Sequence, residues 1–441
     1  MIVTLRCRKK APKYQSGAVV LVTAVVLVIA GTVLAFMTAK VVLNETKISA
    51  NDYRTNQAVQ AAQAAVDRGM AAFTANKGID ATLTAPTPDQ IVDYIEACRI
   101  PPSDFPSDLT SAAELSDTSD KLESSSGFYY YSNDASTGDR CSARGATDRG
   151  TLFGVGWSDD CTATRTISVC LGFPPLFAGD NGPEQPFIAK GSVNLGGNAT
   201  IINRYTNISV WSGENASVQD SAFETYLRPE GTSITDFSSA ALISTDETAN
   251  TQEVSNADSG LGLDIVVNDK TLSNATKEQF WYTYFADSKS NVRDNAAFVD
   301  ISTGETSEGV QLADIDTSEQ DIIWIGDKTL DPDTDPPSSD KFNLGDDIGT
   351  LANPVILFVN GDLDIAANKT IYGLVYVTGK LKLAGGVTII GTIINESTDT
   401  DANKSVGTNN IVFRPFGPET GGATTPKYGP GIVIPGSWKD W

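Results

Sequence analysis

The 441-residue sequence contains no histidine, the residue type that most often serves as a general base and as a zinc ligand. It also has no glycine-rich phosphate-binding loop and no nucleophile-elbow motif. Basic residues are scarce: 32 Lys and Arg stand against 55 Asp and Glu, which gives a formal charge of −23. Nucleic acid and anionic lipid would repel such a chain. These absences predict a protein that is not an enzyme and does not bind nucleic acid.

The N-terminus combines a basic leader with a long uncharged segment. The leader ends at Gly17 and carries five cations and no acidic residue: Arg6, Arg8, Lys9, Lys10 and Lys13. The 22 residues at 18–39 carry no charge; they exceed the about 7–15 of a secretory signal and match the about 20 that cross a bilayer. Cations hold a leader in the cytoplasm. We therefore expect a single transmembrane helix at 18–39, with the C-terminal residues in the periplasm.

The apolar segment runs on into an alanine-rich segment without proline before Pro86. One helical face there collects residues at spacings of three and four: Val59, Ala62, Val66, Met70 and Phe73. A continuous helix over 18–75 would be about 87 Å long, at about 1.5 Å per residue. Its first half would be apolar on all sides and its second half amphipathic. A membrane anchor followed by a stalk helix is the simplest interpretation.

A basic leader that ends in glycine, an apolar helix from the next residue and an amphipathic continuation resemble the type IV prepilins. Within these, "QSGAVVLV" and "NDYRTNQAVQAAQAAVDRG" resemble the PilX-like group of minor pilins. The resemblance implies that a prepilin peptidase cuts between Gly17 and Ala18, with methylation of the new amine, and that the helix is kept. It also implies other minor pilins and a PilY-type tip adhesin as partners. The subunit would leave the inner membrane for an extracellular pilus fibre.

The fifth residue after the cut departs from the pattern of main pilin subunits. Those carry a glutamate there, which pairs with the terminal amine of a neighbour, whereas this chain has Val22. An unpaired carboxylate in an apolar fibre core is costly, so valine suits a subunit that initiates or caps the fibre. Val22 as merely one more apolar residue is the alternative. The type II secretion pseudopilin GspK also lacks this glutamate, so a secretion pseudopilin is the alternative function.

Residues 76–173 are predicted to form a pilin-like head. Three strand candidates are separated by turn residues: "GFYYYSNDA", "GTLFGVGWS" and "TRTISVCLGF". The resemblance implies that they form a small antiparallel sheet against the long helix. The predicted fold class is therefore α+β.

Cysteine usage agrees with export from the cytoplasm. Cys7 leaves with the leader, and four cysteines remain: Cys98, Cys141, Cys161 and Cys170. An even number suits an oxidising periplasm. Of the three pairings that four cysteines allow, we favour the short loop Cys161–Cys170 together with Cys98–Cys141. Free buried cysteines are the alternative.

Residues 174–441 carry an internal repeat of 18 residues. "ILFVNGDLDIAANKTIYG" (356–373) aligns without a gap to "LVYVTGKLKLAGGVTIIG" (374–391), and "GSVNLGGNATIIN" (191–203) matches "GKLKLAGGVTIIG" (379–391). β-Branched residues that alternate between glycine corners at a fixed period predict a β-solenoid, in which stacking buries the apolar face of each coil. The pattern is interrupted at about 220–320, where "NATKEQFWYTYFADSK" predicts an inserted helix. An ordinary β-sandwich with coincidental similarity is the alternative.

An acidic loop in this region is the candidate metal site, and calcium is the candidate ion. Asp331, Asp333 and Asp335 occupy alternate positions, as the first ligands of a calcium loop do. Pro336 replaces the required glycine, and Phe342 stands where a bidentate glutamate would close the loop. The motif is therefore incomplete, and an ordinary acidic loop is the alternative.

Solenoids also host polysaccharide-cleaving enzymes, which need clustered carboxylates or a basic residue on successive coils. The exposed positions expected here, such as Asp362, Asp364, Lys380 and Lys382, have the pattern of solvated strand faces. A third function stays open, in which the solenoid is an adhesin module that binds a surface or a glycan. A row of exposed aromatic residues on one solenoid face would support it.

Overall fold

The computed structural model describes residues 16–75, 111–114, 126–132 and 150–440, apart from residues 161, 179–181, 195, 218–222, 257, 259, 318–320, 400, 417–421, 423–427, 430 and 435–436. The chain divides into two compact units. The first comprises Met1–Leu171 and Val433–Trp441, and the second comprises Gly172–Ile432. Each unit is described by itself.

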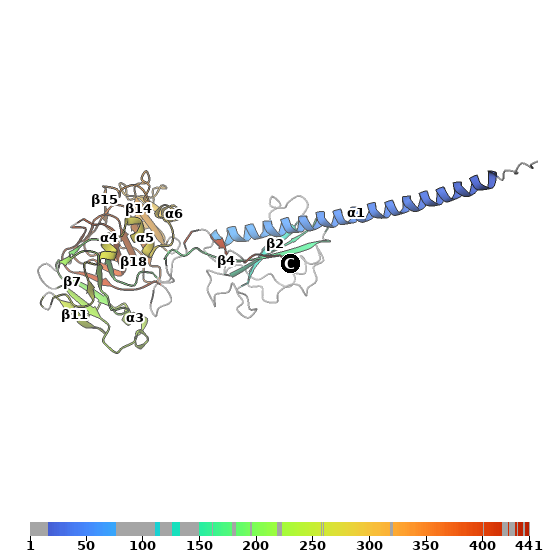
Figure 1. The fold of residues 1–441 in the computed structure, drawn as a ribbon. Helices are drawn as coiled ribbons and strands as arrows, with labels where there is room; N and C mark the ends of the chain where they lie inside the picture. Colours follow the sequence, from blue (N-terminus) through green and yellow to red (C-terminus); the bar gives the residue numbers. More distant parts are fainter. Residues whose placement is uncertain are drawn as a thin grey trace, which may run out of the picture. The chain divides into compact units, whose positions relative to one another are not determined.

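The first unit is built around one helix, α1 (Ser16–Ala75), which confirms the helix predicted at 18–75. The sheet of this unit lies along only the C-terminal part of α1 (Figure 1). That part buries mostly small residues: Ala58, Ala61, Ala62, Ala65, Val66 and Phe73. Val59 and Met70 of the predicted stripe are only partly buried. Alanine favours the helix and also lets a neighbouring backbone come close.

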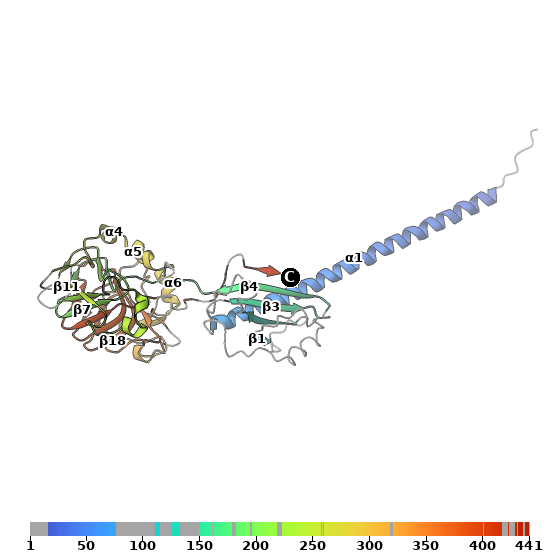
Figure 2. The same ribbon diagram turned by 90° about the horizontal axis from the view of Figure 1, so that it is seen from below.

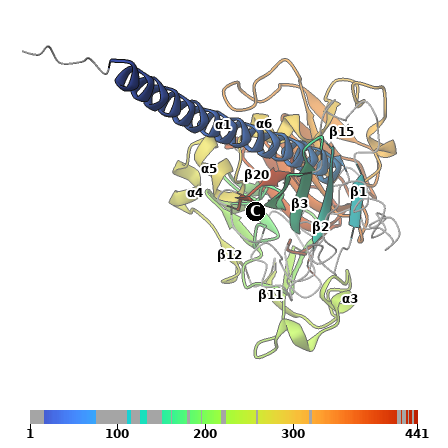
Figure 3. The same cartoon turned by 90° about the vertical axis from the view of Figure 1, so that its right-hand side faces the viewer.

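Among the described residues the sheet has six strands, and the first four in spatial order are each antiparallel to the next: β1 (Ser111–Glu114), β2 (Ser126–Ser132), β3 (Gly150–Trp157) and β4 (Thr164–Gly172). The last three correspond to the three predicted strands. Figure 3 shows α1 lying across β3 and β2. The predicted α+β class, with a long helix on an antiparallel sheet, is therefore confirmed.

Two glycines let α1 approach β3 closely. A Cβ atom on Gly154 would lie 2.4 Å from the carbonyl oxygen of Ala62, and one on Gly156 would lie 2.2 Å from the amide nitrogen of Ala62. Residues two positions apart share one face of a strand, so both glycines face the helix. A larger residue at either position would push α1 away from the sheet.

The C-terminal residues return to the first unit, which corrects the predicted solenoid boundary at 441. β24 (Lys439–Asp440) pairs with β4, with Lys439 beside Ser168, and β23 (Ile432–Val433) also neighbours β4. The amide of Ile434 donates to the carbonyl oxygen of Cys170 at 2.9 Å. Figure 2 shows the C-terminal strand alongside β4. The second unit is thus an insertion between β4 and these last strands.

The second unit is a β-solenoid, as the repeat predicts, and its parallel strands form three stacks. The first stack contains, in spatial order, β13 (Ala297–Asp300), β14 (Ile322–Gly326), β16 (Val355–Val359), the second halves of β18 (Thr370–Val377) and β20 (Thr388–Asn395), β5 (Phe187–Ala189), β8 (Val210–Ser212) and β12 (Ile265–Val266). The second contains β15 (Lys341–Leu344), β17 (Asp362–Ile365), β19 (Leu381–Leu383), β21 (Asn403–Ser405), β6 (Val193–Asn194) and β9 (Ala216–Ser217). The third contains the first halves of β18 and β20, then β22 (Asn409–Val412), β7 (Ala199–Asn203), β10 (Glu224–Leu227) and the antiparallel β11 (Gln252–Asn256).

The strand register of β18 and β20 is the 18-residue repeat itself. Every residue of β18 lies beside the residue 18 positions later in β20, from Thr370 beside Thr388 to Val377 beside Asn395. The strands β17 and β19 keep the same offset. The predicted alignment of 356–373 with 374–391 therefore describes two coils that lie one on the other.

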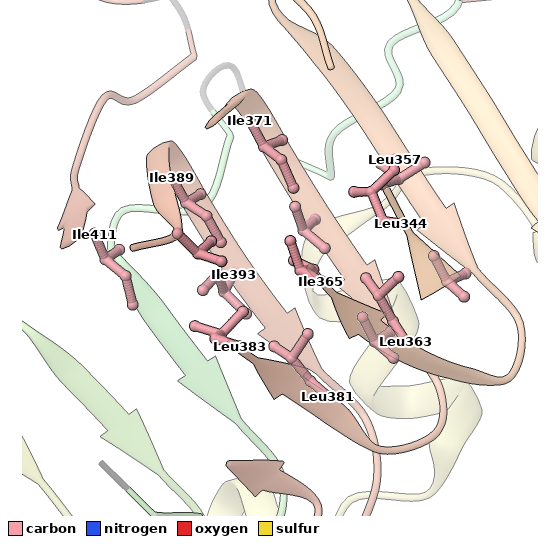
Figure 4. Close-up of a cluster of buried hydrophobic side chains, with 14 of the residues drawn as sticks. Leu344, Leu357, Leu363, Ile365, Ile371, Leu381, Leu383, Ile389, Ile393 and Ile411 are labelled. Atoms are coloured by element: carbon pink, nitrogen blue, oxygen red, sulfur yellow. The ribbon is translucent and has the colours of Figure 1, made fainter. Parts of the chain in front are cut away.

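The solenoid interior is a continuous aliphatic core between the stacks. Figure 4 shows Leu363, Ile365, Leu381 and Leu383 directed into it, and all four are 3% exposed or less. β16 is buried on both faces, because Val355, Leu357 and Val359 join this core while its other residues face outward against an aromatic layer. A strand covered on both faces has a continuous apolar sequence, and "VILFV" is one.

The inserted helix predicted at 274–289 is confirmed as α5 (Lys277–Tyr284), with Thr276 and Gln279 forming its capping box. It lies between α4 (Lys270–Asn274) and α6 (Lys289–Asp294), and a short α3 (Ser239–Leu242) precedes them. Residues 220–320 are not a plain interruption, however, because β10, β12 and β13 within this range extend the stacks. Two 3-10 turns complete the segment: Ile234–Asp236 and Leu312–Asp314.

Candidate functional site

The N-terminal part of α1 is an apolar surface that the described residues of this unit leave exposed. Gly17 and Ala18 lie near the start of the helix, and the side chain of Val22 is 61% exposed. By length and composition, α1 is the one helix among the described residues that qualifies as a membrane span, and none of its apolar window is buried. Cleavage between Gly17 and Ala18, and the assembly role of Val22, stay predictions.

Polar groups in this surface are satisfied within the helix. The hydroxyl groups of Thr23, Thr32 and Thr38 donate to carbonyl oxygens three or four residues earlier, each with a bond of 2.8 Å. A hydroxyl that bonds its own helix needs no water. The surface of α1 therefore suits an apolar environment, either lipid or other apolar helices.

An ion pair connects α1 to the turn between β3 and β4. The guanidinium of Arg54 lies 2.6 Å from the carboxylate of Asp160. Asp160 also accepts hydrogen bonds from the hydroxyl groups of Thr162 and Ser158. These hydrogen bonds, with a smaller contribution from Arg54, lower the pKa of Asp160 to about 2.

The cysteine prediction meets a geometric conflict. Cys170 is disulfide-bonded, while Cys98, Cys141 and Cys161 lie outside the described residues. Six strand positions separate Thr164 from Cys170, which is about 20 Å. The three residue steps from Cys161 to Thr164 span at most about 11 Å, so a gap of about 9 Å remains, beyond the about 7 Å that a disulfide bridges. The strand therefore argues against the pairing of Cys161 with Cys170.

The three aspartates of the acidic loop do not converge on one point. The carboxylate of Asp333 accepts from the amides of Lys289 and Ser290 at the start of α6. Asp331 accepts from the amide of Asp333, and Asp335 accepts from the amide of Asp331. No cluster of three metal-binding side chains occurs among the described residues. Calcium binding at this loop stays a prediction.

The exposed charges of the second stack form ion pairs across neighbouring coils. Lys341 and Lys382 lie 3.1 and 3.9 Å from the carboxylate of Asp364, and Lys380 lies 3.7 Å from that of Asp399. Asp362 accepts a hydrogen bond from the backbone amide of Lys380. These residues form a row of solvent-accessible charges along the second stack, as the sequence predicts for Asp362, Asp364, Lys380 and Lys382.

A cavity of about 550 Å³ lies between the inserted helices and the first stack of the solenoid. Residues of α5, α6, the loop at 332–337 and the ends of β16, β18 and β20 line it. Its buried wall contains Asn360, Thr378 and Glu396, which are 18 residues apart and so occupy equivalent positions on three successive coils. The hydroxyl of Thr378 donates to the side-chain oxygen of Asn360 at 3.1 Å. Polar side chains at equivalent positions of three successive coils thus form a polar column at this edge of the stack.

A buried ion pair lies at one end of the column. The ammonium group of Lys289 is 2.6 Å from Oε2 of Glu396, and the hydroxyl of Tyr376 donates to the same oxygen. Burial and the neighbouring Glu396 raise the pKa of Tyr376 well above its ordinary value, so its hydroxyl stays protonated. Lys289 also lies 5.5 Å from the centre of the Trp281 ring. The pair attaches α6 to the solenoid.

Sequence reasoning missed this cavity, although the repeat contained a signal for it. Asn360, Thr378 and Glu396 are aligned in the 18-residue repeat, directly after strand residues that are apolar or buried. Polar residues at the same position of successive coils are unexpected where that position is buried in the solenoid. The contribution of Lys289 could not be found in this way, because it lies 107 residues from Glu396.

No family model and no curated protein matches this chain. Among solved structures, the chain is similar to the competence-associated pilin ComZ from Thermus thermophilus. That match has 13% sequence identity and a TM-score of 0.22, and it covers 88% of this chain and 97% of that chain. A superposition this poor carries no argument about function, which must rest on the residues of this chain.

Proposed function

We propose that this protein is a PilX-like type IV minor pilin, a structural subunit that enters a pilus fibre through α1. The observation that carries the proposal is the 60-residue helix, whose first part is apolar, exposed and uncharged while its second part packs on β3. A large exposed apolar surface needs lipid or another apolar surface to cover it. A subunit that moves from the inner membrane into a bundle of similar helices meets this need at both stages.

Processing belongs to the same proposal. Prepilin peptidase cuts between Gly17 and Ala18, and the new amine is methylated. Cleavage there removes the cationic leader and leaves the apolar helix at full length, so the helix can leave the bilayer. Retention of the leader would keep the cations in the cytoplasm and the subunit in the membrane.

A position at or near the fibre tip follows from two features. Val22 provides no carboxylate for the amine of a preceding subunit, and residues 172–432 form a second unit that is inserted in the sequence between β4 and the last strands of the first. Such an insertion on every subunit would be hard to fit along a tightly packed shaft. The partners at the tip are other minor pilins and a PilY-type adhesin.

Intact mass and N-terminal sequencing of the native protein test processing. The expected protein starts at a methylated Ala18. Gly17→Glu should keep the leader and remain in the inner membrane. Gly31→Ala is the matched control, because no atom lies within 4 Å of the added Cβ, and it should be processed normally. A native chain that starts at Met1 or inside the helix would contradict the proposal.

Val22→Glu tests the role in fibre initiation. A buried charge without a partner costs several kcal/mol unless it becomes protonated, so we expect fewer fibres per cell while processing and membrane insertion stay normal. Val22→Leu, which keeps the site apolar, should assemble as the native protein does. Antibody labels against the second unit should mark fibre ends, whereas regular labelling along the shaft would exclude a tip subunit.

A further inference from the structure

The cavity between α5, α6 and the solenoid has no part in assembly through α1, and Glu396 indicates that it holds a ligand. The side chain of Glu396 is fully buried and lines the cavity. Its Oε1 accepts no hydrogen bond from any group in the described part of the chain. A buried carboxylate oxygen without a donor is costly, so a donor that enters from the cavity would remove an existing deficit.

The missing donor is a neutral group, because the charge of Glu396 is already balanced. Oε2 faces the ammonium of Lys289 and the hydroxyl of Tyr376. Two further lysines, Lys190 and Lys277, lie nearby. Burial lowers the pKa of Lys190, the negative charge of Glu396 raises it, and the positive charges of Lys277 and Lys289 lower it further. An ammonium ligand would meet three lysines around one carboxylate. A hydroxyl group would satisfy Oε1 without adding charge.

An anionic ligand is also disfavoured, by the other side of the cavity. Glu278, Asp333 and Asp335 line it. Asp333 is held there by bonds of 2.9 and 3.1 Å from the first two backbone amides of α6, whose N-cap is Ser288. Burial raises the pKa of Tyr282, and the negative potential of Asp333 and Glu278 raises it further. An added anion would be repelled at this rim.

The remaining lining offers both hydrogen bonds and an apolar surface. Tyr282 lines the cavity with its side chain 44% exposed, and Pro332, Pro336 and Pro337 lie on the loop beside it. Asn360 and Lys277 add a side-chain amide and an ammonium group to the lining. Polar and charged side chains make up most of the lining, while Trp281, Tyr282 and the three prolines supply its apolar surface. Such a mixture, in a volume of several hundred Å³, suits a small ligand that carries many hydroxyl groups.

We propose that this cavity binds a neutral saccharide, with one sugar hydroxyl donating to Oε1 of Glu396 and a C–H face of the ring against Tyr282. A saccharide carries many hydroxyl groups that both donate and accept, has no charge and presents an apolar face. It therefore matches the unpartnered acceptor, the charge balance and the exposed tyrosine together. The site lies within residues 277–396, so it is independent of the fibre role proposed above.

Saturation-transfer NMR on the full chain tests this, in a detergent that contains no sugar. The probes are glucose, galactose, N-acetylglucosamine, maltose and cellobiose at millimolar concentration. At least one should receive saturation, strongest at its ring C–H protons. Tyr282→Ala should weaken its affinity about tenfold, as truncation of a central contact does. Leu263→Ala is the control, because Leu263 is 99% exposed and does not line the cavity, and it should bind as the native protein does.

A second variant guards against misfolding. Glu396→Gln keeps the shape of the side chain but removes its charge, and it should weaken sugar binding if its thermal transition shows that it folds. If it does not fold, Tyr282→Ala alone decides. The proposal is overturned if none of the five sugars receives saturation, or if binding survives Tyr282→Ala unchanged. It is also overturned if spermidine or glucuronate binds more tightly than every neutral sugar.

Discussion

Substitution of Gly391 by alanine would test the stacking of the solenoid directly. A Cβ atom at this position would lie 1.8 Å from the carbonyl oxygen of Gly373 on the neighbouring coil, and the backbone at Gly391 has φ = +155°. The contact atom is backbone, so no side chain can rotate away. Overpacking costs about 1–3 kcal/mol and a positive φ adds about 1–2 kcal/mol for a residue with a Cβ, which together give about 2–5 kcal/mol. Each kcal/mol corresponds to about 2–4 °C in Tm for a domain of this size.

Hydrogen exchange read on peptides that cover β18 and β20 is the assay, because it reports this part of the second unit separately from the first. Gly391→Ala should increase exchange there and lower the melting temperature by about 6–12 °C for a loss of about 3 kcal/mol. Gly345→Ala is the matched control, since an added Cβ there meets no atom within 4 Å. If Gly391→Ala protects these peptides as well as the native chain does, the stacking of Gly391 on Gly373 is refuted.

Three further outcomes are expected. Gly156→Val should loosen α1 from β3, seen as faster exchange in the second half of α1, because even a single Cβ would lie 2.2 Å from backbone; unchanged exchange would disprove the close approach. Asp160 has its pKa lowered to about 2, so its stabilisation is present above about pH 4 and is lost as the pH falls through about 2. The difference in Tm between native protein and Asp160→Asn should thus be complete at neutral pH, decrease as the pH falls towards 2 and vanish only below about pH 2, and a pH-independent difference would contradict the assignment. Mass mapping of the non-reduced protein should show Cys170 in a disulfide whose partner is not Cys161, and recovery of the peptide linking Cys161 to Cys170 would show that β4 does not persist in solution.

Local patterns determined the elements that the sequence predicted correctly. The start and length of α1 follow from an uninterrupted apolar and alanine-rich segment, and the register of β18 on β20 follows from an 18-residue repeat that both strands share. Such signals are contained within neighbouring residues or neighbouring coils. The capping residues of α5, Thr276 and Gln279, belong to the same class.

Contacts between distant segments were decided only by the tertiary structure. The coils are not stacked in chain order: β5 lies on β20 with Phe187 beside Ile393, and β7 lies on β22, so the first coil of the unit closes against the last. The match of 191–203 to 379–391 revealed that both segments are coils, but any coil of similar shape could have stacked beside either.

The same reason explains the domain boundary and the cavity. The pairing of Lys439 with Ser168 and the ion pair of Lys289 with Glu396 join residues that are more than one hundred positions apart. A hydrophobic period describes which face of an element is buried, but it does not identify the distant segment that covers that face. The sequence by itself therefore determined the helix, the strands and the coil repeat, whereas packing between remote segments decided the order of the coils, the return of the C-terminus and the saccharide site that we propose.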